Sequence, residues 1–306
     1  MSPKEIIAQL RQMMQAEGWS AIVVSGTDPH SSEYLPARWQ ARKFVSGFTG
    51  SYGTVVVTAT HAGLWTDSRY FIQATAQLEG TGIELHKLRV PEAVDYPEWL
   101  ADTLDEGGTV CVDGLCMPLA TVEHMQVLFA PKGIKVVSRP DYIDVLWNDR
   151  PALPEAPVFE LGIAYTGRSR ADKLAWLRDS IAQRSCGSML LSSLDEVAWM
   201  LNLRSSDIAH TPVLISYLWV SADRAVLYAS MDKFDEPLRQ ALAADGVELA
   251  PYAEVMDGVD TWLCDTPIYI DGAMLNYALY EKVTAHFGDK VVNATSPVKL
   301  EKAIKN

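Results

Sequence analysis

Hydrophobic and polar positions follow two different periods along the chain. Short β-branched runs, such as AIVVSG at 21–26 and TVCVDG at 109–114, predict strands, while longer segments with apolar residues three and four apart predict helices. Residues 2–18 form the first of these helical segments. The apolar runs at 54–59 and 62–67 are separated by only two residues, so together they predict a β-hairpin.

The same order of elements occurs twice. In each half, a helix and a strand precede an irregular segment, a predicted hairpin and three helix–strand pairs; the second hairpin falls at 213–220 and 224–230. We therefore predict an internally duplicated α/β protein with two tandem domains, 1–150 and 151–296. Each domain should be a mixed β-sheet with helices on both faces, because hairpins supply antiparallel strands and strand–helix–strand segments supply parallel ones.

Two further segments delimit the domains. The stretch from Leu146 to Gly167 contains three prolines and has no helical period, so it predicts a linker or a strap on the surface. After the second copy, residues 297–306 start a new helix with Pro297 at its first position, and the sequence stops there. We expect this segment to begin a third domain.

Composition excludes several classes of function. The chain has 306 residues, 48% of them apolar, and a net charge of −13, so a nucleic-acid backbone would be repelled. No apolar stretch reaches membrane-spanning length, and the N-terminal helix does not have the pattern of a signal peptide. The four cysteines form no C-x-x-C pair; Cys111 and Cys264 lie in apolar contexts, which indicates buried, reduced thiols in a cytoplasmic protein.

Gly47, Gly50 and Gly53 fall three apart in FVSGFTGSYGTVVVT, just before a predicted strand. A phosphate-binding loop needs the order strand, glycines, helix, because the amides of the helix N-terminus hold the anion. Here the glycines precede a strand and no helix follows them. We therefore interpret them as residues that let the backbone turn tightly into the hairpin.

No catalytic constellation emerges from the spacing of reactive residues. The chain has no G-x-S-x-G stretch, and its six histidines occur singly, without H-x-x-x-H or H-E-x-x-H spacing. Each histidine is therefore interpreted as a loop or surface residue. We predict no catalytic residue and no metal ligand in this chain.

One polar cluster interrupts apolar surroundings, in LWTDSRYF. Strand alternation predicts Trp65, Asp67 and Arg69 on one face. In one interpretation, an Asp67–Arg69 pair closes the strand, and Asp67 or Ser68 caps the following helix. In the other, Trp65, Asp67 and Arg69 form a rim that meets a ligand or a neighbouring subunit.

Several stretches taken together resemble the N-terminal region of aminopeptidase P, in its cytosolic three-domain form. They occur in the family's order and cover the chain from about Asp28 to Pro212. The stretches are DPHSSEY (28–34), RKFVSGFTGSYGTVVV (42–57), LWTDSRYFIQA (64–74), LWNDRP (146–151), YTGRSRADKLAWLR (165–178) and SLDEVAWMLNLRSSDI (193–208).

The resemblance implies a function for the parent protein. Aminopeptidase P removes the N-terminal residue from peptides with proline second, using two divalent metal ions, usually manganese, in a C-terminal domain. The two preceding domains have the creatinase N-terminal fold and carry no metal ligands, so this chain alone would need no cofactor and would be inactive. The resemblance further implies a peptide substrate, a cytoplasmic homodimer without nucleic-acid or membrane partners, and a substrate entrance shaped by the rim residues Trp65, Asp67 and Arg69.

An alternative function stays open. A histone-chaperone subunit with a peptidase-like N-terminus binds proteins without cleaving them, and the acidic charge of this chain is compatible with such a binding module. For either function, a following domain must pack against this region, and such packing buries apolar side chains. We expect those side chains on the helix from Pro297 and on the strap around Leu146 and Trp147.

Overall fold

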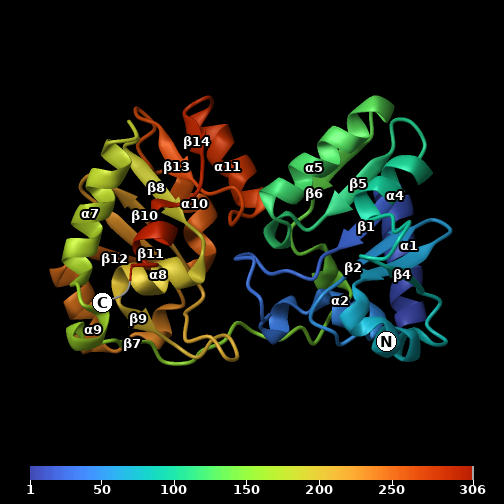
Figure 1. Cartoon of the computed structure of the whole chain (residues 1–306), viewed down its shortest axis with the longest axis horizontal. Helices are drawn as coiled ribbons and strands as arrows, with labels where there is room; N and C mark the ends of the chain where they lie inside the picture. Colours follow the sequence, from blue (N-terminus) through green and yellow to red (C-terminus); the bar gives the residue numbers. More distant parts are fainter. Residues whose placement is uncertain (305–306) are drawn as a thin grey trace. The chain divides into compact units, whose positions relative to one another are not determined.

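The computed structural model describes residues 1–304, so the last two residues of the segment 297–306 lie outside it. The chain divides into two compact units (Figure 1). The first domain comprises residues 1–29 and 37–152; the second comprises residues 30–36 and the chain from Leu153 onward. Within residues 1–304, no helix combines the length and the apolar character needed to cross a bilayer.

The first domain is built on a six-stranded mixed sheet in the order β4-β3-β2-β1-β5-β6. Its strands are β1 (Ala21–Val24), β2 (Thr54–Thr58), β3 (Ala62–Thr66), β4 (Glu84–Lys87), β5 (Thr109–Val112) and β6 (Lys135–Ser138). The predicted hairpin is confirmed: β2 runs antiparallel to both of its neighbours, β1 and β3, whereas all other neighbours are parallel.

Helices cover both faces of this sheet. They are α1 (Pro3–Glu17), α2 (Ala41–Ser46), α3 (Phe71–Leu78), α4 (Tyr96–Thr103) and α5 (Leu119–Phe129). Strand alternation divides the core: Val55, Val57 and Leu64 pack with apolar residues of α1, α2 and α3, while Trp65 points to the other face and meets Trp99 of α4 at 5.2 Å between ring centroids.

The second domain repeats this architecture, which confirms the predicted fold class. Its main sheet has the order β12-β11-β10-β8-β13-β14, with the same pattern of strand directions as the first. The strands are β8 (Ser188–Leu191), β10 (Ser216–Ser221), β11 (Ala225–Ala229), β12 (Val247–Pro251), β13 (Ile268–Ile270) and β14 (Val291–Asn293), and β7 (Phe159–Glu160) pairs with β9 (Leu203–Arg204). The helices are α6 (Ile163–Thr166), α7 (Arg170–Ala182), α8 (Leu194–Leu201), α9 (Glu236–Ala244), α10 (Val255–Val259), α11 (Tyr277–Phe287) and α12 (Pro297–Glu301).

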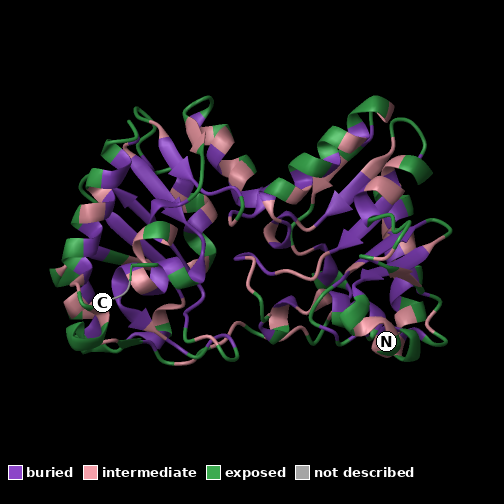
Figure 2. Ribbon diagram, viewed as in Figure 1, coloured by how far each residue is buried: buried purple, intermediate pink, exposed green. Residues whose placement is uncertain are grey.

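The central strands of both sheets are buried along their whole length, and the exposed residues gather on the outer faces of the helices and in the loops (Figure 2). The four cysteines are free thiols, as expected. The expectation that Cys264 is buried was wrong. It lies between α10 and β13 in an irregular segment next to the exposed Leu263, so its apolar sequence context does not belong to a core element.

The glycine-rich segment wraps a buried arginine. The Arg42 guanidinium, on α2, donates one hydrogen bond to the carbonyl of Gly53 at 3.0 Å and another to that of Gly50. Burial lowers the pKa of Arg42 to about 10, which still leaves it cationic at neutral pH. Gly47 and Gly53 have φ of 74° and 150°, in the region that favours glycine, so the interpretation of this segment as a tight turn is confirmed.

A half-buried carboxyl group, that of Asp113, closes the carboxyl end of β5. The Asp113 carboxylate accepts hydrogen bonds from the backbone N–H groups of Leu115 at 3.0 Å and Asp141 at 3.3 Å. Burial, together with the nearby charge of Asp141, raises the pKa of Asp113 to about 6, although the Arg150 guanidinium acts in the opposite direction. Arg150 itself pairs with Asp141 at 2.6 Å.

We predict that Arg42→Met destabilises the first domain by about 2–4 kcal/mol, because two buried carbonyls lose their donor. The matched control is Lys43→Met, at the exposed neighbouring position on the same helix, which should change the unfolding free energy by less than about 0.5 kcal/mol. Urea unfolding followed by circular dichroism measures both. Equal stability of the two variants would contradict the role assigned to Arg42.

We predict that Asp113 makes the fold less stable as the pH rises. Its folded pKa of about 6 lies above the value of about 3.9 for an unfolded aspartate, so its contribution favours the fold at low pH and is lost between about pH 4 and 6. The unfolding free energy of Asp113→Asn, relative to the native protein, should therefore increase by about 1 kcal/mol from pH 5 to pH 7.5. The exposed Asp149→Asn is the control; the same pH dependence in both variants would refute the prediction.

Candidate functional site

A cavity of about 460 Å³ opens at the carboxyl end of the first sheet. From β1 the chain adds β2, β3 and β4 on one side of the sheet, and later β5 and β6 on the other side. The strand order therefore reverses direction at β1, and the cavity lies at the carboxyl end of that strand. Ligands of open α/β sheets bind at such points. The lining residues are Ser25, Gly26, Thr27, Tyr52, Gly53, Thr54, Trp65, Leu88, Asp95, Tyr96, Pro97, Met117, Pro118, Ala120, Thr121 and His124.

Trp65 forms part of the wall of this cavity. Its indole is 1% exposed, stacks on the ring of His86 at 3.8 Å and 9°, and donates from Nε1 to the carbonyl of Val94 at 3.1 Å. With its polar atom already bound to the backbone, Trp65 offers a ligand only an apolar surface.

Asp67 and Arg69 do not continue the strand face of Trp65, so the predicted alternation was wrong beyond β3. The strand ends at Thr66, and Asp67 caps a 3₁₀ turn at 68–70 by accepting from the N–H of Arg69 at 3.1 Å. The predicted Asp67–Arg69 pair and N-cap are confirmed: Arg69 Nη2 lies 2.9 Å from Asp67 Oδ2, and Nε lies 3.0 Å from Oδ1. These hydrogen bonds lower the pKa of Asp67, which is therefore ionised at neutral pH.

Two arginines lie beside the mouth of the cavity and share this one aspartate. Arg89 Nη1 is 4.0 Å from Asp67 Oδ2, and the guanidinium carbons of Arg69 and Arg89 each lie 5.8 Å from the ring centroid of Tyr52, which lines the cavity. Both arginine side chains are mostly exposed. Two cations paired with one carboxylate leave an excess positive charge, and their planar forks suit an incoming carboxylate.

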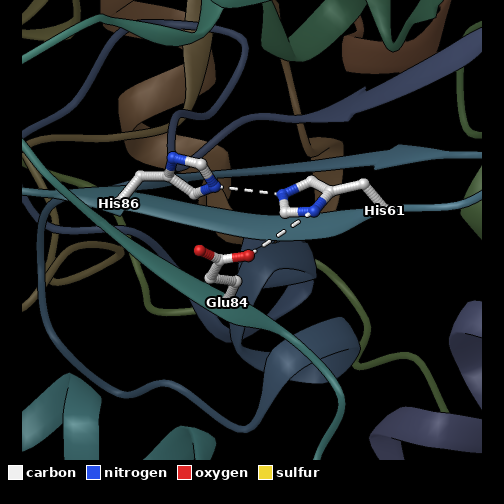
Figure 3. A group of neighbouring side chains, drawn as sticks. All are labelled: His61, Glu84 and His86. Carbon is white, nitrogen blue, oxygen red and sulfur yellow. Dashed lines mark hydrogen bonds and ion pairs between the residues drawn. The ribbon is translucent and has the colours of Figure 1, made fainter.

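Next to Trp65, the structure brings His61 close to Glu84 and His86, which lie more than twenty residues further along the chain (Figure 3). His61 ends the β2–β3 turn, and Glu84 and His86 lie two apart on the edge strand β4, so they share one face. His61 Nε2 lies 3.0 Å from His86 Nε2, and its Nδ1 lies 3.7 Å from Glu84 Oε2. In Figure 3, dashed lines join the His61 ring to both His86 and Glu84.

The electrostatic surroundings keep both imidazoles neutral at pH 7. Burial is the main cause of the lowered pKa of His61, and Arg11 lowers it further, while Glu84 acts in the opposite direction. The pKa of His86 is lowered by burial and by its proximity to His61. Two neutral imidazoles 3.0 Å apart can share one N–H as a hydrogen bond, or both can donate lone pairs to a cation.

Sequence spacing did not reveal this cluster, because metal-site patterns count separations along a single helix or loop. Its one sequence signal is the alternation of Glu84 and His86 in a predicted strand; the approach of His61 depends on the pairing of β3 with β4. His30, also interpreted as a loop or surface residue, lies in a loop but is buried, with its ring 4.4 Å from that of Tyr217.

Comparisons with known proteins match both halves of the chain. The model of the creatinase/prolidase N-terminal domain matches residues 6–145, and a second model with the same description matches residues 149–306.

Similarity to individual proteins extends over nearly the whole chain. The chain is 33% identical to aminopeptidase P1 of Arabidopsis thaliana, over 99% of this chain and 50% of that protein. It is also 33% identical to human Xaa-Pro aminopeptidase 2, over 98% of this chain and 45% of that protein. A solved X-prolyl aminopeptidase from Caenorhabditis elegans, described as a cytosolic enzyme with a di-nuclear active site, superposes with a TM-score of 0.93 at 32% identity, covering all of this chain and 52% of that one. The chain spans about half the length of these relatives.

Proposed function

The chain belongs to the creatinase/prolidase N-terminal domain family, and from this premise we propose that it forms the non-catalytic N-terminal region of a metal-dependent Xaa-Pro aminopeptidase. The observation that carries the proposal is the superposition of the entire chain, with a TM-score of 0.93, on about half of a di-nuclear X-prolyl aminopeptidase. In this proposal, two divalent metal ions, which we expect to be manganese, are bound by the half of the enzyme that follows this chain. The enzyme acts in the cytoplasm on peptides whose second residue is proline.

Exposed apolar side chains in the second domain support the presence of a packing partner. Ile163 and Tyr165 on α6 are 63% and 77% exposed, and Leu300 and Ile304 in the C-terminal segment are 74% and 71% exposed. Tyr165 and Ile304 line one small cavity, so α6 and the C-terminal segment are neighbours. The final helix therefore contributes exposed apolar side chains as expected, and a following domain that begins at residue 297 would cover them.

The strap residues do not contribute to this surface. Leu146 is only 7% exposed, and Trp147 stacks on Phe44 of the first domain at 4.6 Å and 9°. The expectation for this strap was wrong, because its apolar side chains are used to complete the core of the first domain.

The α12 segment is also held firmly to its own domain. Ser296 Oγ donates to Glu196 at 2.5 Å, and Lys299 Nζ pairs with Asp271 at 2.8 Å. These contacts tie the C-terminal helix to α8 and to the end of β13. A catalytic domain that follows α12 would therefore be joined to the second domain at a rigidly held helix. Such an attachment would let this region hold a defined position beside the active site and contribute to substrate access and dimer contacts.

We predict that the purified 306-residue chain does not hydrolyse Xaa-Pro peptides when Mn²⁺ is added. A longer protein that contains this chain and a catalytic domain, with about the length of the relatives, should hydrolyse them. Release of the N-terminal residue from a Xaa-Pro-Xaa tripeptide measures both, and a chelator should abolish the activity of the longer protein. Chelator-sensitive hydrolysis by the 306-residue chain would overturn the proposal. An inactive longer protein would instead support the binding module of the histone-chaperone type.

Arg69 is proposed to engage the carboxylate of a bound peptide at the mouth of the cavity, with Asp67 as its positioning residue. The guanidinium meets Asp67 through Nε and Nη2, and it lies at an exposed edge beside Tyr52. Trp65 would contribute the apolar wall behind that mouth.

We predict that Arg69→Ala in the longer enzyme lowers kcat/KM by tenfold or more for a short peptide with a free C-terminus, with the melting temperature unchanged. The same peptide with an amidated C-terminus should be hardly affected, because it offers no carboxylate. Arg224→Ala, which breaks a comparably exposed Arg224–Glu248 pair in the second domain, is the control. Equal kinetics for Arg69→Ala and the control would leave Arg69 with only its structural pairing to Asp67.

A further inference from the structure

We propose that His61 and His86 form a binding site for a divalent late transition metal, such as Ni²⁺, Cu²⁺ or Zn²⁺, on the first domain. Both Nε2 atoms face one another from adjacent segments, and Glu84 approaches the opposite edge of the His61 ring (Figure 3).

The distance between the donor atoms fits two ligands on one metal. Nitrogens 3.0 Å apart, each at a metal–nitrogen distance of about 2.0–2.1 Å, subtend an angle of about 94° at the metal. That angle belongs to neighbouring positions of a tetragonal or octahedral site, which Ni²⁺ and Cu²⁺ prefer. An increase of about 0.3 Å in the distance between the two Nε2 atoms would give the tetrahedral angle that Zn²⁺ prefers.

Glu84 fits the role of a positioning residue. When both Nε2 atoms bind the metal, the shared proton moves to Nδ1 of the imidazole that held it on Nε2, and no proton is lost overall. On His61, Nδ1–H then points toward the Glu84 carboxylate, 3.7 Å away before any adjustment. A carboxylate on the outer nitrogen of a metal-bound histidine fixes the ring and raises its basicity.

The absence of a side chain at Gly63 makes room for the two rings. A Cβ at this position would lie 2.8 Å from His61 Nε2, 2.8 Å from His86 Cδ2 and 2.6 Å from the Trp65 ring. Trp65 stacks flat on His86 and fixes its plane. The side chain of His61 is 24% exposed, which leaves a path for an ion from solvent.

The second domain is an internal control, because its register identifies the equivalent positions. Gly63 pairs with Glu84 in the first domain, and Val226 pairs with Glu248 in the second. By the same register, Arg224 stands in the place of His61.

At these equivalent positions the second domain has different chemistry. Ala250 stands in the place of His86, and an Arg224–Glu248 pair at 2.8 Å stands in the place of His61 and Glu84. Val226 occupies the position of Gly63, since no second ring needs its space. The fold is therefore compatible with a surface ion pair here, and the histidine pair and its glycine are specific to the first domain.

The test is calorimetric titration of Ni²⁺ into the 306-residue chain at pH 7.5, with Cys264→Ser as the background, because that thiol is exposed. We expect one equivalent to bind, His61→Asn and His86→Asn each to weaken binding at least tenfold, and Glu84→Gln to weaken it severalfold. His124→Asn is the matched control: His124 Nε2 lies 3.2 Å from Glu98 without a second imidazole, so its loss should leave the affinity unchanged. Absence of binding, or binding unaffected by the two asparagine variants, would overturn the proposal.

A second measurement needs no variant and is independent of variant folding. Diethyl pyrocarbonate modifies accessible neutral imidazoles, and mass spectrometry of peptides reports each histidine separately. Saturating Ni²⁺ should protect His61 and His86 and leave His124 modified as before. Unchanged modification of His61 and His86 would refute the site even if nickel binds elsewhere on the chain.

Discussion

The turn that leads into β2 of the first domain is built around the buried guanidinium of Arg42. Burying a cation is costly unless it is hydrogen-bonded, and both Nη atoms of Arg42 donate to backbone carbonyls, of Gly53 and Gly50, rather than to a carboxylate. A Cβ at Gly26 would lie 2.3 Å from Arg42 Nη1, so that glycine also serves the arginine. The direction in which the chain enters β2 follows from this turn. The hairpin, and with it the positions of His61 and Trp65, depends on it.

The two domains share the same strand order and strand directions, but they differ in the side chains on their sheets. Both sheets insert one antiparallel hairpin beside the first strand and add parallel strands around it, so backbone hydrogen bonding specifies the same six-strand order twice. The faces under the helices differ. Trp65 stacks on His86 in the first domain, while Tyr228 accepts a hydrogen bond from Trp262 at 3.2 Å in the second. In such a duplicated protein, functional polar residues are therefore best sought at equivalent strand positions where the two domains have different side chains.

The candidate features of the first domain lie around Trp65. The cavity and the two arginines beside it lie at the carboxyl end, and the histidine pair lies farther back, in the β2–β3 turn and on β4, with Trp65 next to both. Membership of the family explains the fold on which these features lie, because the family models match nearly the entire chain. It does not by itself explain the histidines, whose chemistry rests on their own geometry.

Sequence alone determined the duplicated α/β order, the hairpins and the turn at the glycines, and it offered the Asp67–Arg69 pair as one of two interpretations, because each depends on residues adjacent or nearly adjacent in the chain. Only the tertiary structure decided that Cys264 is exposed, that Trp147 packs on Phe44, and that His61 meets His86. Those outcomes depend on strand pairing and on packing between segments distant in sequence, where the spacing of residues along the chain carries no information about distance in space.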